Sequence, residues 1–374
     1  MLVLRIDSNS PYQQVVGIGG IGTGIFFALE ENHTLGRNES RPGRLLDIRD
    51  YCKLHIVSHY VAKLLAASSS GEPFHVVPVG KIGNDAAGQF VLNEMRAVGM
   101  DTRFVGIVPD KPTLFSACFQ YPDGAGGNIT TSNSAAAALC NQDLDGIGEL
   151  LAASGRRAIA LLVPEAPLEV RKQFLSLATR GGAFRAASFV LAEIQPAIRF
   201  GMFEQLDLVA LNEGEAEEFV GSSFSTKEPT AFLDKCQALI RNSYPGLRMV
   251  VSVGKDGSYG LTRDELNYCP APEVEVASTA GAGDCLLGGV VAATAAGIPF
   301  VSPSSRRKSL TDGPLATALE FAVLLASYKV TSPHTIHPTA SLTTLVDFAH
   351  GLGVSFAPDL ERLFVEKRDD KPRI

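Results

Sequence analysis

The residues best suited to chemistry lie in one short segment, Ser278 to Asp284, which reads Ser-Thr-Ala-Gly-Ala-Gly-Asp. A strongly apolar stretch, Leu286 to Ala296, follows it and predicts a helix. The first amides of a helix have no intrahelical acceptor and the helix dipole is positive there, so this turn is suited to hold a phosphate or a developing anion. Asp284 could take a proton from an attacking hydroxyl, and phosphoryl transfer needs both functions.

A second pattern with polar side chains is Asn212-Glu213-Gly214-Glu215. Both segments also have a structural explanation, because Asp and Asn commonly cap helices and glycines commonly form tight turns. Each segment alone therefore leaves a capped helix and a functional site as open alternatives.

Strands and helices alternate through most of the chain, and they must position these segments. This alternation is typical of βαβ units and predicts an α/β fold with a largely parallel sheet. We expect a β-hairpin between 113 and 131, and a loop, a helix capped by Asp85 and a turn over 80–102. The other predicted strands are Gln14–Ile18, Phe74–Val79, Ala158–Val163, Phe184–Leu191, Leu206–Leu211 and Met249–Val253, and the other predicted helices are Leu54–Ala67, Leu168–Ala178 and Ala231–Arg241.

Composition excludes several classes of protein. The chain is 45% hydrophobic and 20% charged, which predicts a sizeable globular core. Its net charge of −7 argues against a nucleic-acid partner. No apolar run approaches the roughly 18 residues that span a bilayer, and Met1 to Gln14 lack the order of a signal peptide. We therefore expect a cytoplasmic protein without a membrane partner.

Five motifs in this order resemble the ribokinase-like (PfkB) family of carbohydrate kinases. The Gly-Ala-Gly-Asp core of the first segment matches the family's second signature. The other four matches are Gly80–Gly88 with the family's first-half helix motif, Tyr121–Gly124 with the turn of its β lid, Asn212–Glu215 with its Asn-x-x-Glu, and Val250–Gly257 with the strand and turn that line the nucleotide.

The resemblance implies a three-layer α/β/α sandwich with a mostly parallel central sheet and a small β lid. It implies one kinase domain over residues 1–365, with lid strands from about 22–45 and 113–132. Residues 366–374 then form a charged tail. The family architecture also leaves room for a homodimer formed through the lid.

The resemblance implies a role for each candidate site residue, with ATP and Mg²⁺ as cofactors. The acceptor would be a hydroxyl of a sugar, polyol or nucleoside. The assigned roles are general base for Asp284, anion hole for the amides of Gly281, Ala282 and Gly283, nucleotide binding for Asn212, Glu215, Gly254 and Thr279, magnesium binding through water for Glu215, and substrate binding for Glu165 and Gly20.

The sequence departs from the family pattern mainly in its substrate half. Gly22-Thr23-Gly24 replaces the Asp that usually follows the first strand, and Asp50 to Lys53 replace an expected Gly-Gly followed by Asn. Ser278 stands where many relatives have an Asp that helps bind a monovalent cation, so a potassium requirement is doubtful. The resemblance therefore indicates the reaction better than it indicates the acceptor.

Two other functions remain open. Gly17 to Gly22 fit the GxGxxG pattern of a dinucleotide-binding dehydrogenase, provided that a helix follows through Phe26 to Glu30. The polar segment His33 to Arg44, however, lacks the second strand with a terminal acid that such a site needs. The third alternative is a kinase homologue that binds a metabolite without turning it over.

Overall fold

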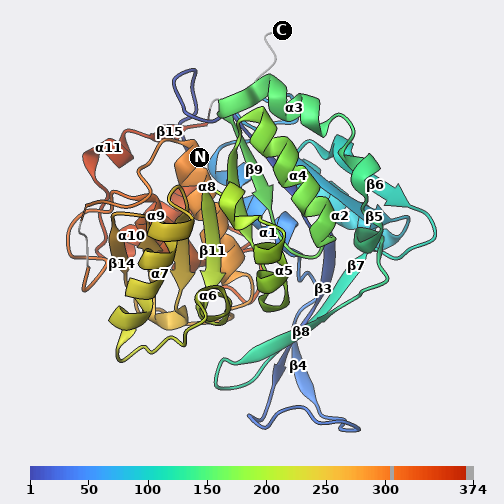
Figure 1. Ribbon diagram of the computed structural model, residues 1–374. Coiled ribbons are helices and arrows are strands. Elements are labelled where there is room, and N and C mark those ends of the chain that lie inside the picture. The colour runs from blue at the N-terminus through green and yellow to red at the C-terminus, as the bar shows by residue number, and fades with distance from the viewer. Residues whose placement is uncertain (304–306, 368–374) are drawn as a thin grey trace.

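The computed structural model describes residues 1–303 and 307–367, and its centre is a nine-stranded sheet (Figure 1). The strands from β12 to β6 run parallel, whereas β13 pairs antiparallel with both β12 and β14. This confirms the predicted mostly parallel sheet. In spatial order the strands are β14 (Leu266–Cys269), β13 (Ser258–Leu261), β12 (Arg248–Ser252), β11 (Leu208–Asn212), β10 (Phe184–Ser188), β9 (Ala158–Leu162), β2 (Gln14–Ile18), β5 (His75–Gly83) and β6 (Val105–Val108).

Helices cover both faces of this sheet. Successive strand residues point to opposite faces, so Val15 belongs to one buried cluster and Val16 to the other. The first face is covered by α1 (Lys53–Leu64), α2 (Ala86–Ala97), α8 (Ala282–Ala295), α9 (Ala318–Lys329) and α10 (Leu342–Gly351), and the second by α3 (Ile147–Ser154), α4 (Leu168–Gly181), α5 (Ile194–Arg199), α6 (Glu213–Val220) and α7 (Pro229–Ser243). The predicted three-layer α/β/α sandwich is therefore confirmed.

Asp85 caps α2 as predicted, because its carboxylate accepts a hydrogen bond from the Gly88 amide. The predicted loop from Gly80 was wrong over its first residues. Gly80 to Gly83 extend β5, since their backbones pair with β6.

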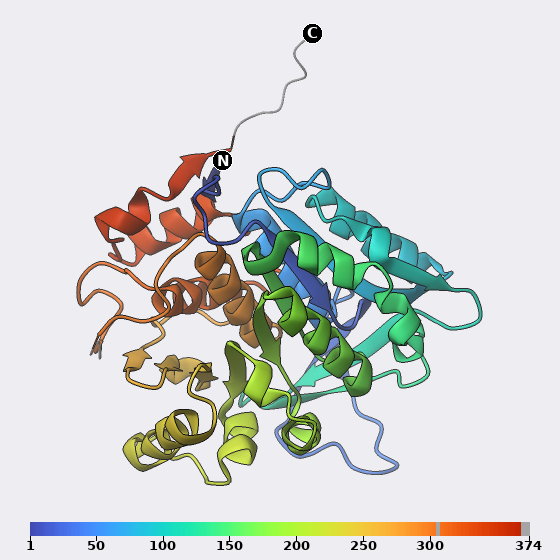
Figure 2. The same ribbon diagram turned by 45° about the horizontal axis from the view of Figure 1, so that its top comes forward.

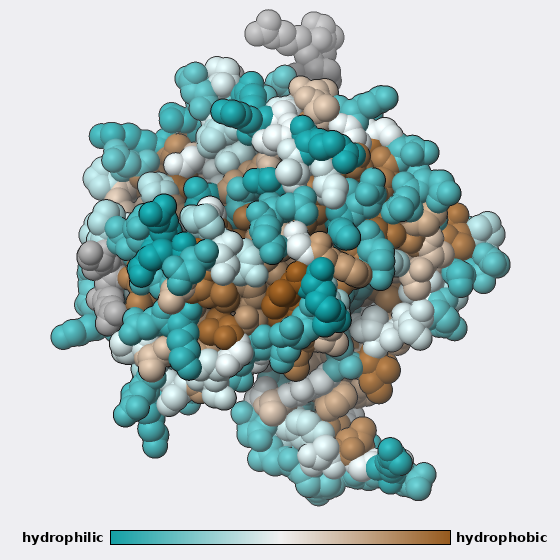
Figure 3. Space-filling view, in the orientation of Figure 1, coloured by the Kyte–Doolittle hydropathy of each residue, from teal (hydrophilic) through white to brown (hydrophobic). Residues whose placement is uncertain are grey.

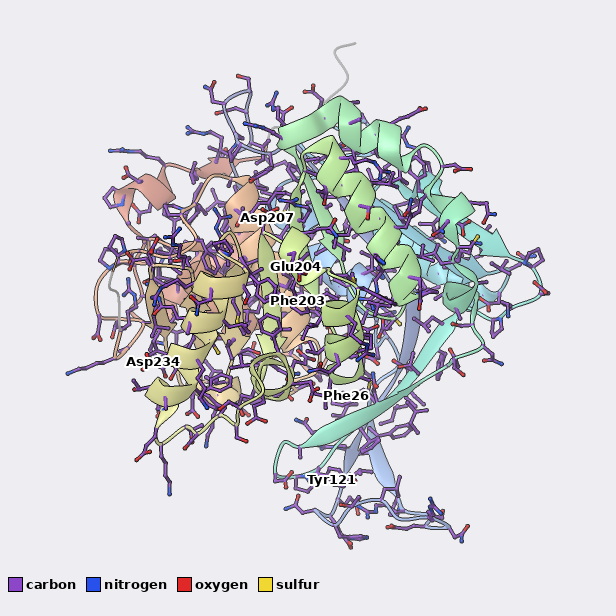
Figure 4. The ribbon with its side chains drawn as sticks, in the orientation of Figure 1. Phe26, Tyr121, Phe203, Glu204, Asp207 and Asp234 are labelled. Carbon is purple, nitrogen blue, oxygen red and sulfur yellow. The ribbon has the colours of Figure 1, made fainter. Side chains whose placement is uncertain are left out.

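A second, four-stranded sheet projects from the body as a lid (Figures 1 and 3). Its spatial order is β4 (Gly43–Asp47), β3 (Gly22–Leu29), β7 (Leu114–Gln120) and β8 (Gly126–Thr130). The hairpin predicted between 113 and 131 is β7 and β8, and β3 pairs parallel with β7. Figure 4 labels Phe26 on β3 and Tyr121 just beyond β7.

The close pairing of β3 and β7 explains two glycines. A Cβ on Gly22 would lie 2.1 Å from the Leu114 carbonyl oxygen, and one on Gly24 would lie 2.3 Å from that of Ser116. The dehydrogenase alternative required a helix through Phe26 to Glu30. That expectation was wrong, because Phe26 lies in β3 and pairs with β7 on one side and β4 on the other.

The described ends of the chain lie side by side (Figure 2). β1 (Leu2–Leu4) pairs antiparallel with β15 (Phe364–Glu366), which follows the short helix α11 (Pro358–Glu361). Glu366, the first residue of the predicted tail, ends β15, and 368–374 lie outside the described residues. In the part of the chain that the structure describes, no helix is both long and apolar enough to cross a membrane.

Candidate active site

The Ser278 to Asp284 turn leads directly into α8. Gly281 is the N-cap of α8 and has φ +74°, a conformation that glycine adopts without strain. A Cβ there would also lie 2.8 Å from the Thr335 carbonyl oxygen. The helix starts at Ala282, earlier than the predicted Leu286, so Gly283 and Asp284 occupy its first turn. The turn is thus a helix N-terminus with one carboxylate beside it.

This turn forms part of a cleft of about 1400 Å³ at the carboxyl end of β11 and β12. Ligands of open α/β sheets bind outside this end of the strands. The cleft brings together every residue predicted to act in catalysis or to bind the nucleotide. These residues are Asn212, Glu215, Gly254, Thr279, Gly281, Ala282, Gly283 and Asp284.

Lys53 also lines the cleft, and its Nζ lies 3.7 Å from Oδ2 of Asp284. The Asp284 carboxylate is the main cause of a raised pKa for Lys53, against the effect of burial, and Glu165 and Glu215 act in the same direction. Sequence reasoning did not assign Lys53 a role. A signal was available, because Lys53 is the first residue of α1 and a cation there opposes the helix dipole.

The two predicted substrate residues, Glu165 and Gly20, lie against each other next to this ion pair. The Oε2 of Glu165 accepts a hydrogen bond of 3.0 Å from the Lys53 amide. A Cβ on Gly20 would lie 2.3 Å from Cβ of Glu165. Glu165 has φ +70°, which is uncommon outside glycine, and burial raises its pKa. It therefore holds the start of α1 rather than being a free surface charge.

Asn212 and Glu215 form a reciprocal cap at the start of α6. The Asn212 side chain accepts from the Glu215 amide and the Glu215 carboxylate accepts from the Asn212 amide, both at 2.9 Å. The helix-capping explanation is thus correct for this pair. Glu215 also faces the cleft, and burial raises its pKa.

A magnesium ion fits this donor set only as a partner of the nucleotide. Within residues 1–303 and 307–367, no group of three His, Cys, Asp or Glu side chains could hold a metal. Mg²⁺ usually keeps several waters and binds through one or two carboxylates together with substrate phosphates. Glu215 at the wall of the cleft, close enough to interact electrostatically with Lys53 and Asp284, suits that mode of binding.

Asp50 is a further carboxylate that sequence reasoning did not assign. Its amide donates to the Gly24 carbonyl oxygen at 3.2 Å, and its Oδ2 accepts from Ser116 Oγ at 2.7 Å and Cys118 Sγ at 2.9 Å. Burial raises the pKa of Asp50. A carboxylate thus lies at the base of the lid beside Gly24, where the chain lacks the expected Asp.

The lid touches the turn directly. Nε2 of Gln120, at the end of β7, donates to Oγ1 of Thr279 at 2.9 Å. Gly124 and Ala125, in the turn between β7 and β8, also line the cleft. The lid therefore covers the side of the cleft that holds the Ser278 to Asp284 turn.

Comparison with known proteins agrees with this geometry. Residues 58–342 match the model of the pfkB family carbohydrate kinases. A bifunctional ribokinase/ribose-5-phosphate isomerase A of Fructilactobacillus sanfranciscensis is 26% identical over 253 residues. That match takes in 66% of this chain and 43% of the bacterial protein, so the chain spans less than half of that relative.

Solved structures show the same fold at low sequence identity. Ribokinase from Cryptococcus neoformans var. grubii serotype A, in complex with ADP, has a TM-score of 0.69 and 20% identity, covering 90% of this chain and 99% of that one. Ribokinase from Giardia lamblia has a TM-score of 0.72 and 16% identity, covering 89% and 99%. Because the family model matches most of the chain, the protein belongs to the pfkB family of carbohydrate kinases.

Proposed function

We propose that the protein transfers the γ-phosphoryl group of ATP to a hydroxyl of a sugar or sugar-like small molecule. The observation that carries this proposal is the position of Asp284, which lies in the first turn of α8 within the cleft and 3.7 Å from Lys53. A base and a set of backbone amides on one helix start suit a reaction in which a proton leaves as an anion develops.

In the proposed step, Asp284 accepts the proton of the acceptor hydroxyl while its oxygen forms a new bond to the γ-phosphorus. The bond from that phosphorus to the β,γ-bridging oxygen breaks, and ADP leaves. The amides of Gly281, Ala282 and Gly283 receive the moving phosphoryl group at the helix start.

The remaining predicted residues surround this centre. We assign Gly254 and Thr279 to the nucleotide, and Asn212 and Glu215 to the nucleotide phosphates. Glu215 would hold Mg²⁺ through water, and the ion would neutralise charge on those phosphates. On the acceptor side, Gly20 and Glu165 form the wall beside the Lys53 amide.

The direct test is a phosphorylation screen with ATP and Mg²⁺ against sugars, polyols and nucleosides, read by ADP release and by mass spectrometry of the acceptor. A product one phosphate heavier than its acceptor supports the proposal. Binding of ATP and of an acceptor without any turnover contradicts it and supports the metabolite-binding alternative, which the missing Asp at Gly24 favours. The screen needs no assumption about the acceptor.

We also propose that the lid forms a homodimer and that the protein acts in the cytoplasm. The lid exposes large apolar side chains, among them Ile129 at 70% and Leu45 at 49%. Such side chains are common at interfaces between subunits. Light scattering should give a dimer for the native chain and a monomer for Ile129→Asp; a native monomer would exclude the dimer.

A further inference from the structure

Lys329 is a fully buried lysine behind the Ser278 to Asp284 turn. It is the last residue of α9, its exposure is 0%, and its Nζ donates to the Ser278 carbonyl oxygen at 3.0 Å. Among the described residues, it forms no ion pair with a carboxylate. An ammonium group without a carboxylate partner is costly to bury, so its retention requires a compensating function.

The contacts of Ser278 show where this charge acts. Ser278 is the first residue of the turn, and its Oγ accepts from the Ala280 amide at 3.2 Å. The Ser278 amide donates to the Val330 carbonyl oxygen at 3.2 Å, next to Lys329 in sequence. Both the side chain of Lys329 and the backbone that follows it therefore fix the start of the turn.

The charge is balanced only at longer range. Burial lowers the pKa of Lys329 to about 8, while Cys285, Asp50, Asp47 and Asp284 oppose that change. The ammonium is therefore still protonated near neutral pH. Because the surroundings are buried, its field is screened weakly and reaches the helix start.

We propose that Lys329 is a positioning residue for phosphoryl transfer, whose buried ammonium fixes the Ser278 to Asp284 turn and adds a permanent positive charge behind its anion-binding amides. This inference rests on the kinase function proposed above. It also gives a reason why a monovalent cation is dispensable here: the chain carries its own cation at the residue where many relatives are expected to have an Asp for one.

The test compares two variants that remove the charge in different ways. Lys329→Met keeps most of the side-chain volume, whereas Lys329→Ala leaves a space that ammonium or methylammonium can enter. We expect both to lower kcat by about 10- to 100-fold while KM for ATP stays within about twofold. Ammonium should restore turnover of the Ala variant and leave the Met variant unchanged. Lys235→Met, on the exposed side of α7, is the matched control.

A second readout is independent of turnover. Ammonium chloride should raise the Tm of Lys329→Ala above its value in tetramethylammonium chloride of equal ionic strength, with no such difference in the native protein. Native-like kcat in Lys329→Met, or an Ala variant whose turnover and Tm both ignore ammonium, would overturn the proposal. If the native protein phosphorylates no acceptor, the kinase function fails, and the Tm comparison still decides whether a cation is held at this turn.

Discussion

Lys53 Nζ and Asp284 Oδ2, 3.7 Å apart, join the first turns of two helices that lie far apart in the sequence. Two helix N-termini meeting at one point create a positive potential, and Lys53 adds to it. Asp284 is the counter-charge at the centre of this potential. A γ-phosphoryl group entering the cleft would thus meet one base inside an environment built for anions.

Replacing Asp284 by Asn should remove the base while preserving shape. We expect Asp284→Asn to lower kcat by about 10²- to 10⁴-fold and to leave ATP affinity nearly unchanged, since the proton is transferred only in the chemical step. Calorimetric titration of ATP and steady-state kinetics check both parts. Asp234→Asn, at an exposed position of α7, is the control. Unchanged turnover in Asp284→Asn would remove Asp284 as the base.

Lys53→Met should affect both substrate binding and turnover. Without the ammonium, the cleft loses a charge that would face the phosphates, so we expect kcat/KM for ATP to fall by about 10- to 100-fold. Lys53→Arg should recover part of the loss. Lys63→Met, in the last turn of α1, serves as the control. If Met and Arg variants behave alike, the charge of Lys53 is not what the reaction uses.

The contrast between Lys53 and the Ser278 to Asp284 turn shows what a sequence can predict. The turn, the Asp85 cap and the Asn212 cap involve residues that are close along the chain, so their patterns were visible. The parallel pairing of β3 with β7 and the contact of Lys329 with Ser278 join distant segments, and no local pattern encodes them. A lysine in the last turn of a helix, as at Lys329, also matches an ordinary helix end.

The hydrogen bond from Gln120 to Thr279 should limit wasteful hydrolysis of ATP. The lid closes over the turn through this contact, and closure excludes water from the phosphoryl group. We expect Gln120→Ala to raise the ratio of ATP hydrolysis to acceptor phosphorylation by a factor of about 3 to 10. ADP release measured with and without acceptor gives this ratio. Gln173→Ala, exposed on α4, should leave it unchanged; a native ratio in Gln120→Ala would argue against the contact.

Asp85 should contribute to stability in a pH-dependent way. Burial alone would raise its pKa, but hydrogen bonds from Thr113 Oγ1, the Thr113 amide and the Gly88 amide outweigh burial and lower it. The stabilisation is thus complete above the unfolded pKa of about 3.9 and is lost as pH falls through the lower folded value.

We expect Asp85→Ala to lower the free energy of unfolding by about 2 kcal/mol at pH 7, because α2 loses its cap and β7 its tie to that helix. Urea denaturation at several pH values should show the difference from the native protein shrinking below about pH 4. Asp234→Ala is the control without buried contacts. A difference that stays constant down to pH 3 would mean that the carboxylate charge is not involved.

Lys329 should make activity and stability depend on pH in opposite directions. Its pKa is lowered to about 8 by burial, and the groups that influence its charge are Asp47, Asp50, Asp284, Cys285 and His337. A positioning ammonium predicts that kcat falls as pH rises through about 8. Ammonium-supplemented Lys329→Ala should keep its rate up to a higher pH, because free ammonium loses its proton at a higher pH than this buried group.

The stability effect has the opposite sign. A lysine with a depressed folded pKa destabilises the fold below about pH 8, and this cost disappears as pH rises towards the ordinary value of 10.5. At 1.36 kcal/mol per pKa unit, Lys329→Met should gain up to about 3 kcal/mol at pH 7, with the gain vanishing near pH 10. Urea denaturation at pH 7 and pH 9.5 measures this gap. A less stable Met variant at both pH values would show that Lys329 serves packing, whereas a more stable and slower enzyme is the outcome expected of a charge retained for turnover.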